Sequence, residues 1–134
     1  MSNPPDPSLD ILYLDNHLIA VRKPAGILTQ SDDSGGVSLM DQVKDWIKTE
    51  YKKPGKVFLG LVHRLDRPVS GIVVFARTSK GASRLSEQFR KKTTKKTYRA
   101  WVEGTPQPPQ ASLMHYLRKE KSLKATVFPR ATPN

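Results

Sequence analysis

The stretch from Gly71 to Arg77, with the sequence GIVVFAR, constrains the fold of this chain more than any other feature. Its continuous run of β-branched and aromatic residues, without polar alternation, is typical of a strand that is covered on both faces. Thr78 or Ser79 follows directly and can cap a helix. We therefore expect a central strand with a helix after it, in a sheet built from other parts of the chain.

Further strands are predicted on both sides of this segment. Two short apolar runs, Ile11 to Asp15 and Leu18 to Arg22, are spaced as the arms of a β-hairpin. The segment from Tyr98 to Glu103 alternates between apolar and polar residues, which predicts another strand. Two weaker strand candidates lie at Leu113 to Leu117 and Ala125 to Phe128.

Two helices are predicted between these strands. The first opens with a capping box at Ser38–Asp41 and runs to about Tyr51, where the Lys-Lys-Pro-Gly sequence of residues 52–55 stops it. The second follows the central strand, and Leu85 and Phe89, four residues apart, form its inward stripe. Strands and helices thus alternate irregularly along the chain.

The charge balance points to an anionic partner. The sequence holds 23 lysine and arginine residues against 12 aspartate and glutamate residues, a formal net charge of +11 with a pI near 10.1. Nucleic-acid backbone is the first candidate and an anionic membrane the second. The alternative is a basic surface that is only solvated.

Composition also narrows the function classes. The sequence has no cysteine, which excludes disulfides, thiolate chemistry and cysteine-bound zinc. His17, His63 and His115 lack a metal-ligand spacing, so we expect no metal and no cofactor. No run approaches the ~18 apolar residues of a membrane span, and the polar, proline-rich residues 1–8 do not form a signal peptide. We expect a cytoplasmic protein with a disordered lead over residues 1–8.

The segment from His63 to Gly71, HRLDRPVSG, places one carboxylate between two guanidinium groups. Positive charge beside Asp66 favours its ionised form, and an ionised, fixed carboxylate can act as a nucleophile. Arg64 and Arg67 are flat, permanently charged donors that suit phosphate. The alternative is that Asp66 is a turn former, a cap or half of a structural ion pair.

Four segments, in order, resemble the RluA-type RNA pseudouridine synthases. His63 to Ala76, HRLDRPVSGIVVFA, closely resembles the signature of that family. Ile11 to Gly26 is similar to its opening hairpin with a Lys-Pro-Ala-Gly turn, and Thr78 to Arg90 to its next helix. Lys96 to Gly104, KTYRAWVEG, is similar to its Lys-x-Tyr-x-Ala strand. The resemblance covers nearly all of residues 9 to 117.

This resemblance implies an α+β fold, with a mixed, largely antiparallel β-sheet and flanking helices. It implies isomerisation of specific uridines in ribosomal or transfer RNA, without cofactor or metal. A later Thr-Gly-Arg-x-His-Gln-Ile-Arg type segment of the family, whose arginine pairs with the catalytic aspartate, has no match in this sequence. We therefore expect residues 9–134 to be part of a catalytic domain. A catalytically incomplete RNA-binding fragment is the alternative.

The resemblance also assigns roles to single residues. Asp66 matches the catalytic nucleophile, Tyr98 the tyrosine that stacks on the flipped uracil, and Arg64 the arginine that fills the vacated space. An ion pair for Arg64 and an ordinary strand position for Tyr98 are the alternatives. Lys23 and Pro24 match an early turn with a structural role. The residues expected to bind RNA are His63, Arg64, Arg67, Arg90, Lys91, Lys92, Lys95 and Lys96.

Other functions remain open on the sequence alone. A basic assembly protein of ribosomal type would share the charge and would not need Asp66. A hydrolase of N-glycosidic bonds could use one carboxylate flanked by arginine, although four ordered motifs argue against it. The basic run at 90–96 could also be a solvated helix end rather than a phosphate track.

Overall fold

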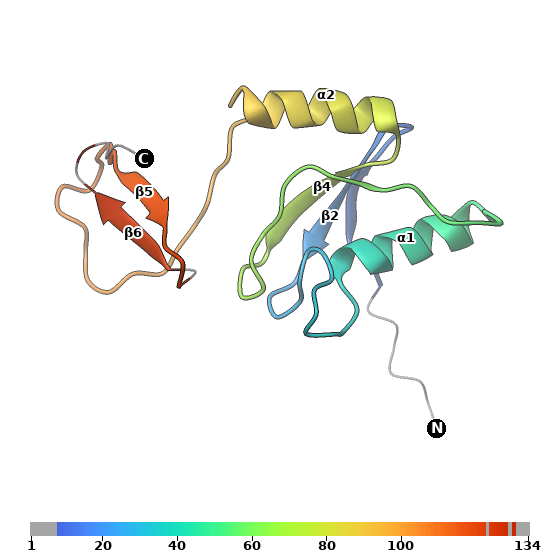
Figure 1. Ribbon diagram of the computed structural model, residues 1–134, viewed down its shortest axis with the longest axis horizontal. Coiled ribbons are helices and arrows are strands. Elements are labelled where there is room, and N and C mark those ends of the chain that lie inside the picture. Colours follow the sequence, from blue (N-terminus) through green and yellow to red (C-terminus); the bar gives the residue numbers. More distant parts are fainter. Residues whose placement is uncertain (1–7, 123, 129, 131–134) are drawn as a thin grey trace. The chain divides into compact units, whose positions relative to one another are not determined.

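The structure of the chain is a computed structural model that describes residues 8–122, 124–128 and 130. It divides into two compact units, Met1–Lys96 and Thr97–Asn134 (Figure 1). Most of the predicted disordered lead, residues 1–7, lies outside the described residues. Each unit has its own sheet. In the part of the chain that the structure describes, no helix is long and apolar enough to cross a membrane.

The first unit is built on a sheet of four antiparallel strands in the order β1-β2-β4-β3. The strands are β1 (Ile11–Leu14), β2 (Leu18–Lys23), β3 (Gly60–Leu61) and β4 (Gly71–Ala76). The predicted hairpin is confirmed, and Asp15 fixes its turn by accepting the backbone N–H groups of His17 and Leu18 at 2.7 and 2.6 Å. In the centre of the sheet, Val21 lies opposite Val73.

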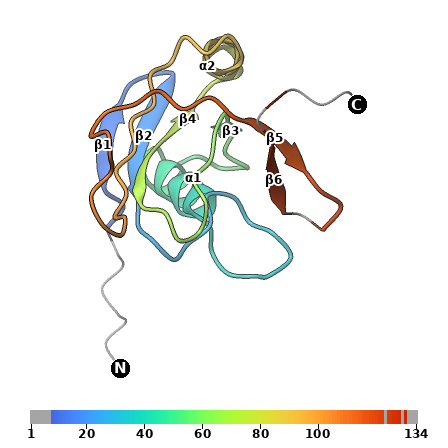
Figure 2. The same ribbon diagram turned by 90° about the vertical axis from the view of Figure 1, so that its left-hand side faces the viewer.

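Helix α1 (Leu39–Glu50) covers one face of this sheet (Figure 2). Its predicted capping box is present, because the Ser38 hydroxyl accepts the Asp41 N–H and the Asp41 carboxylate accepts the Ser38 N–H. The residues that α1 and the sheet bury together are Ile19, Val21, Leu39, Val43, Ile47, Val73 and Phe75. This shared core holds the helix across the middle of the sheet.

Helix α2 (Ser79–Arg90) lies on the other side of the sheet (Figure 1). Thr78 caps it by accepting the Gly81 N–H at 3.0 Å. The helix approaches β3 closely, since a Cβ on Gly60 would lie only 2.8 Å from the Cβ of Ala82. Contacts of α2 concentrate on β3 and β4 near the Ala76 end.

The prediction that the central strand is covered on both faces is wrong for part of its length. Val73 and Phe75 are fully buried on the α1 side, but the Ile72 side chain on the other face is 59% exposed. Val74, on that same face, is only half-buried. The physical reason is that α2 packs over the Ala76 end and leaves the Gly71 end uncovered.

The second unit contains a hairpin of β5 (Tyr116–Lys119) and β6 (Ala125–Phe128). The predicted strand at Ala125–Phe128 is confirmed, whereas its partner begins three residues later than the predicted Leu113. The predicted strand at Tyr98–Glu103 is wrong, because this segment pairs with no described strand. Alternation of apolar and polar residues is compatible with a strand that has two different faces. It does not supply the neighbouring strand that the backbone must hydrogen-bond to. The fold class itself, α+β with antiparallel sheets and flanking helices, is confirmed.

Candidate active site

Asp66 lies in a tight turn between β3 and β4, at the end of the sheet where Lys23 and Gly71 pair. Its backbone carbonyl accepts the N–H of Val69 at 3.0 Å, which closes the turn. The Asp66 side chain is exposed, and it forms no hydrogen bond or ion pair with another residue in the described ranges. The carboxylate is therefore open to a ligand.

The residue before Asp66 is fixed by a buried threonine. The Thr29 hydroxyl donates to the carbonyl of Leu65 at 2.8 Å and accepts the Leu65 N–H at 3.1 Å. Thr29 is 2% exposed, so these bonds are shielded from water. Its own segment is in turn joined to α1, because the Met40 N–H donates to the Thr29 carbonyl at 3.0 Å. The position of Leu65 thus depends on the start of α1.

The residue after Asp66 is fixed by the turn that follows β2. The carbonyl of Arg67 accepts the Gly26 N–H at 2.7 Å and the ammonium group of Lys23 at 3.2 Å. The same ammonium donates to the carbonyls of Pro24 at 3.1 Å and Ile27 at 2.7 Å. Lys23 is fully buried, and its three donors are matched to three acceptors. The expected structural role of Lys23 and Pro24 therefore has a specific form: their turn holds the Asp66 turn.

Glycine is required where this turn enters β4. Gly71 has φ +154°, a conformation that residues with a side chain rarely adopt, and a Cβ there would lie 3.2 Å from Cδ1 of Leu65. Leu65 packs against the hydrophobic core. The turn is therefore anchored by its apolar residue as well as by its backbone.

Burial shifts the ionisation of Lys23. The low-dielectric surroundings lower the pKa of its ammonium, and the nearby Asp66 carboxylate acts in the opposite direction. Lys23 supplies positive charge beneath the Asp66 turn without reaching its surface.

Three of the predicted site residues line one hollow of about 170 Å³ together with residues 28–32: Arg64, Asp66 and Arg67. Arg64 is exposed and forms no ion pair with a described residue. Arg67 donates from Nη2 to the Ser34 hydroxyl at 2.8 Å, so it also holds the adjoining loop. The Ser34 hydroxyl and backbone N–H bond to Asp32 and lower the pKa of that carboxyl.

The His63 side chain bonds to the sheet and does not line this hollow. Its Nε2 accepts the backbone N–H of Val74 at 2.9 Å, in a place where a neighbouring strand would offer a carbonyl. This bond requires an unprotonated Nε2. Burial, and to a lesser extent the charge of Lys96, lower the pKa of His63 and favour that neutral form.

The His63 ring connects the Asp66 turn to the end of α2. It stacks on Phe89 with ring centroids 4.8 Å apart and an interplanar angle of 16°. The Lys96 ammonium lies 5.6 Å from the centroid of the same Phe89 ring. The basic run at 90–96 is therefore attached to the segment that leads to Asp66.

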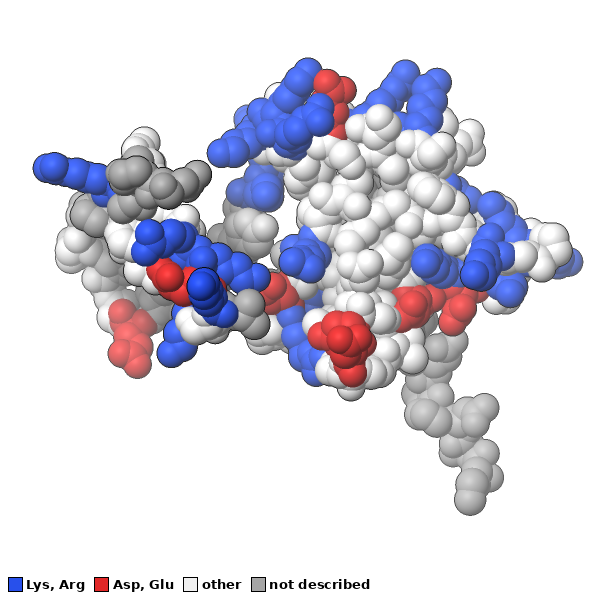
Figure 3. Space-filling model, viewed as in Figure 1, with Lys and Arg blue, Asp and Glu red and all other residues white. Residues whose placement is uncertain are grey.

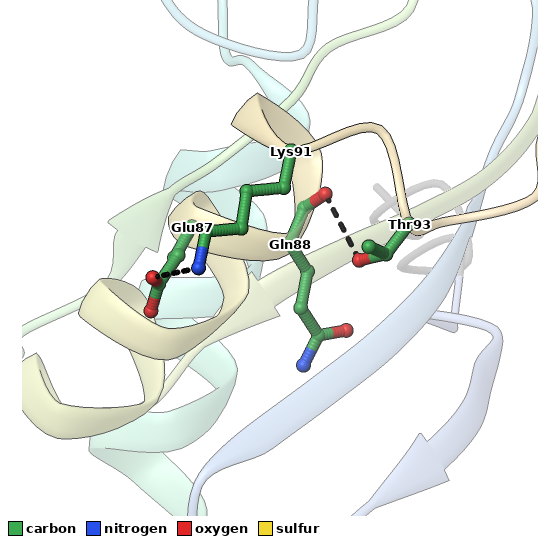
Figure 4. Close-up of polar contacts among 4 residues, drawn as sticks. All are labelled: Glu87, Gln88, Lys91 and Thr93. Carbon is green, nitrogen blue, oxygen red and sulfur yellow. Dashed lines mark hydrogen bonds and ion pairs between the residues drawn. The ribbon is translucent and has the colours of Figure 1, made fainter.

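The lysines and the arginine of this basic run differ in whether they form an ion pair with a described residue. Lys91 forms an ion pair with Glu87 at 2.7 Å, one helical turn away (Figure 4). In the same view, the Thr93 hydroxyl donates to the Gln88 carbonyl at 3.3 Å and helps end the helix. The members of the run that are exposed and form no ion pair with a described residue are Arg90, Lys92, Lys95 and Lys96. RNA binding by Lys91 would compete with its pair to Glu87.

Tyr98 belongs to the second unit and is 64% exposed. It lies in an extended segment without a described strand partner. The role of Tyr98 beside Asp66 stays a prediction.

Sequence reasoning missed Thr29 altogether and gave Lys23 only a general structural role. A threonine in an irregular segment carries no pattern that marks it as a hydrogen-bonding partner of a residue 36 positions away. A lysine at the end of a strand is ordinarily exposed. The only available signal was the apolar, turn-rich sequence around Lys23, which does not predict burial of the amine.

The sequence profile of the family described as RNA pseudouridylate synthase matches residues 17–131. This match spans the Asp66 turn, both helices and the hairpin of the second unit. The chain belongs to the RNA pseudouridylate synthase family. The RluA-type resemblance of the sequence is thereby confirmed.

Individual members of the family agree with this assignment. The chain is 41% identical over 105 residues to the dual-specificity RNA pseudouridine synthase RluA of Haemophilus influenzae, covering 76% of this chain and 44% of that protein. It is 41% identical over 99 residues to tRNA pseudouridine synthase C of Haemophilus ducreyi, covering 72% and 37%. It is 34% identical over 115 residues to the uncharacterized RNA pseudouridine synthase YhcT of Bacillus subtilis, covering 85% and 37%.

A solved structure supports the fold. The human RNA pseudouridylate synthase domain containing 4 superposes with a TM-score of 0.53 at 27% sequence identity, covering 63% of this chain and 30% of that one. The chain spans less than half the length of each curated relative named above. It thus corresponds to part of what those family members contain.

Proposed function

We propose that the chain carries the nucleophile of an RNA pseudouridine synthase, and that Asp66 acts on a uridine of ribosomal or transfer RNA. The observation that carries this proposal is the clamped turn. Buried hydrogen bonds hold Leu65 and Arg67 on either side of Asp66, while the carboxylate itself projects into an open hollow. A nucleophile needs a fixed position and a free reacting atom.

The reaction suits a lone carboxylate. The bond from ribose C1′ to N1 of uracil breaks, and a bond from C1′ to C5 forms. C5 loses its proton and N1 gains a proton. The composition of the nucleotide does not change, so no electron donor or acceptor is required. The base must first leave its stack to reach a side chain, at a cost of a few kcal/mol.

The surrounding cations would hold the RNA. Arg64, exposed at the rim of the hollow, would stack on neighbouring bases and take the space of the flipped uracil. The basic run at 90–96 would contact phosphates, which positions RNA without reading its sequence. Its attachment to His63 through Phe89 supports a track that leads to the Asp66 turn.

The direct test is incubation of the purified chain with unmodified RNA, followed by carbodiimide labelling and mass-spectrometric detection of pseudouridine. The proposal expects product from the unaltered chain and none from Asp66→Ala. Asp45→Ala is the matched control, because Asp45 is an exposed carboxylate on α1 and does not line the hollow. Product from Asp66→Ala would refute the nucleophile assignment.

The proposed stacking role of Tyr98 has its own test. Tyr98→Phe keeps the aromatic ring and should retain pseudouridine formation, whereas Tyr98→Ala removes the ring and should lower pseudouridine formation. Equal activity of the two variants and the unaltered chain would refute the role.

A second candidate is an RNA-binding fragment without turnover. It is favoured because no lysine or arginine within residues 8–122, 124–128 and 130 forms an ion pair with the Asp66 carboxylate. This candidate predicts RNA binding that falls steeply with salt, together with no pseudouridine. The same incubation separates it from the first.

A further inference from the structure

Helix α1 ends in a backbone motif that places a lysine where glycine is the usual residue. The N–H of Lys53 donates to the carbonyl of Lys48 at 3.0 Å, and that of Lys52 to Thr49 at 3.3 Å. These are the two bonds of a Schellman motif, whose left-handed residue is most often glycine. Here that residue is Lys52, with φ +48°. A side chain at this position strains the backbone.

Helix α2 ends in the same way. The N–H of Thr93 donates to the carbonyl of Gln88 at 3.1 Å, and that of Lys92 to Phe89 at 3.2 Å. The left-handed residue is again a lysine, Lys92, with φ +56°. Two independent helix ends therefore use lysine in place of the residue that the backbone favours. Both positions thus place an exposed lysine ammonium at the end of a helix.

The loop after α1 is strongly basic, although the Asp66 site does not include it. Between residues 48 and 56 the chain has one acidic residue, Glu50, and four lysines. All four are exposed, and none forms an ion pair with a described residue. We call Lys48, Lys52, Lys53 and Lys56 the α1 basic end. Figure 3 shows lysine and arginine side chains gathered at the right of the view, where Figure 1 places the end of α1.

The α1 basic end is held firmly against the sheet. Tyr51 is the C-cap residue of α1, and the Arg77 guanidinium lies 4.7 Å from the centroid of its ring. Arg77 also donates from Nη1 to the backbone carbonyl of Asp15 in the β1–β2 turn. Trp46 meets the Tyr51 ring edge-on, with centroids 6.3 Å apart. The lysines therefore project from an ordered platform.

This platform is remote from Asp66. The first turn of α1 adjoins the Asp66 turn, because Thr29 bonds both to Met40 and to Leu65. The helix has 12 residues, which corresponds to about 18 Å of length. Tyr51, at its far end, contacts Arg77, which follows the opposite end of β4. One nucleotide at Asp66 could not also reach the α1 basic end.

We propose that the α1 basic end is a second binding surface for the phosphate backbone of RNA, at the opposite end of α1 from the Asp66 turn. This proposal rests on the proposed function, which places the reacting nucleotide at Asp66. It adds that the RNA substrate extends well beyond that nucleotide. Ammonium groups are compact point charges that suit phosphates. RNA is favoured over an anionic membrane because the lysines lie on a helix end and loop, without the apolar helix face that inserts into lipid.

The test measures binding of the full chain to an unmodified transfer-RNA transcript as salt is varied. Lys52→Gly is the central variant, since it removes the charge while it relieves the strained backbone, so its melting temperature should rise. The triple variant Lys52→Gly/Lys53→Gln/Lys56→Gln should bind the transcript about tenfold or more weakly, with a salt slope smaller by roughly 0.7 to 0.9 per lysine removed. Lys52→Arg, which keeps the charge, should bind like the unaltered chain.

A short uridine-containing oligoribonucleotide separates the two RNA surfaces. It is too short to span the helix, so the triple variant should bind it as the unaltered chain does. Unchanged transcript affinity and salt slope in the triple variant would overturn this proposal alone. Binding to phosphatidylserine vesicles but not to the transcript would assign the surface to a membrane and overturn it. No salt-dependent RNA binding by the unaltered chain would refute both this proposal and the proposed function. Pseudouridine formed by Asp66→Ala would refute the nucleophile assignment alone.

Discussion

The two units of the chain use their apolar side chains in opposite ways. Every buried apolar residue in the described ranges lies in Met1–Lys96, where α1 and the sheet enclose a shared core. In Thr97–Asn134 no described residue is buried, and the Trp101 side chain is completely exposed. Both units contain apolar strand segments, but only the first buries apolar side chains between a sheet and a helix.

This difference indicates where the stability of the chain resides. Burial of apolar surface contributes about 25 cal/mol per Å², so the free energy of unfolding must come almost entirely from the first unit. The clamped Asp66 turn belongs to that unit, and its anchors Lys23 and Thr29 are buried there. The candidate nucleophile is therefore positioned by residues that do not require the second unit.

The largest expected effect comes from the core of the first unit. Phe75→Ala should lower the free energy of unfolding by about 3–5 kcal/mol, because it empties a fully buried site. Trp101→Ala, an equally drastic change in the second unit, should alter it by no more than about 0.5 kcal/mol. Urea unfolding followed by circular dichroism measures both. Similar losses in the two variants would show that the second unit is packed after all.

The next effect concerns the clamp on Leu65. Thr29→Val keeps the volume but leaves the buried N–H and C=O of Leu65 without their partner, which should cost about 1–3 kcal/mol. Thr105→Val is the control, because Thr105 is exposed in the second unit. Denaturant midpoints for the two variants measure the difference. A Thr29 variant as stable as the Thr105 variant would mean that the clamp contributes nothing.

A pH-dependent effect is expected at His63. Its pKa is lowered in the folded chain, so the unfolded chain takes up the proton at the higher pH. The stability is therefore complete above the ordinary histidine pKa of about 6.5 and falls as the pH drops below it. His63→Phe keeps the stack on Phe89 but removes the acceptor for Val74, and should cost about 1 kcal/mol at neutral pH.

The same variant should also reduce the loss of stability between pH 7 and pH 5. Thermal unfolding across this range gives the profile, and His115→Phe, at an exposed position in the second unit, supplies the control. A profile that changes with His115 but not with His63 would contradict the assignment.

The smallest effect has the opposite sign. Lys52→Gly should raise the free energy of unfolding by about 1 kcal/mol, because glycine adopts the left-handed cap conformation without strain. Lys119→Gly, within β5 of the second unit, should bring no such gain. Melting temperatures of the two variants decide the comparison. A loss of stability in Lys52→Gly would show that the lysine itself supports the helix end.

Local patterns predicted much of the first unit. The hairpin turn at Asp15, the capping box at Ser38 and the stop after Tyr51 are each set by a few adjacent residues, and all are present. The prediction that the central strand is covered on both faces failed at Ile72. Whether a strand is covered depends on distant elements and not on the strand's own sequence. The strand at Tyr98–Glu103 failed for the same reason.

The candidate site could be predicted only in its outer parts. The spacing of Arg64, Asp66 and Arg67 in one motif indicated that they would meet, and they line one hollow. The buried partners Thr29 and Lys23 could not be found, because hydrogen bonds between irregular segments leave no periodic pattern. The ammonium of Lys23 required a tertiary structure to supply its three carbonyl acceptors.

Hydrogen exchange of single amides in the full chain, followed by NMR, tests most directly the claim that the first unit alone holds the Asp66 turn in place. The amides of Leu65 and Gly26, which donate to Thr29 and to the Arg67 carbonyl, should exchange slowly, like the strand amides around Val73. The amides of Tyr98–Glu103, which pair with no described strand, should exchange fast. Leu65 and Gly26 amides that exchange as fast as those of Tyr98–Glu103 would contradict a preformed turn.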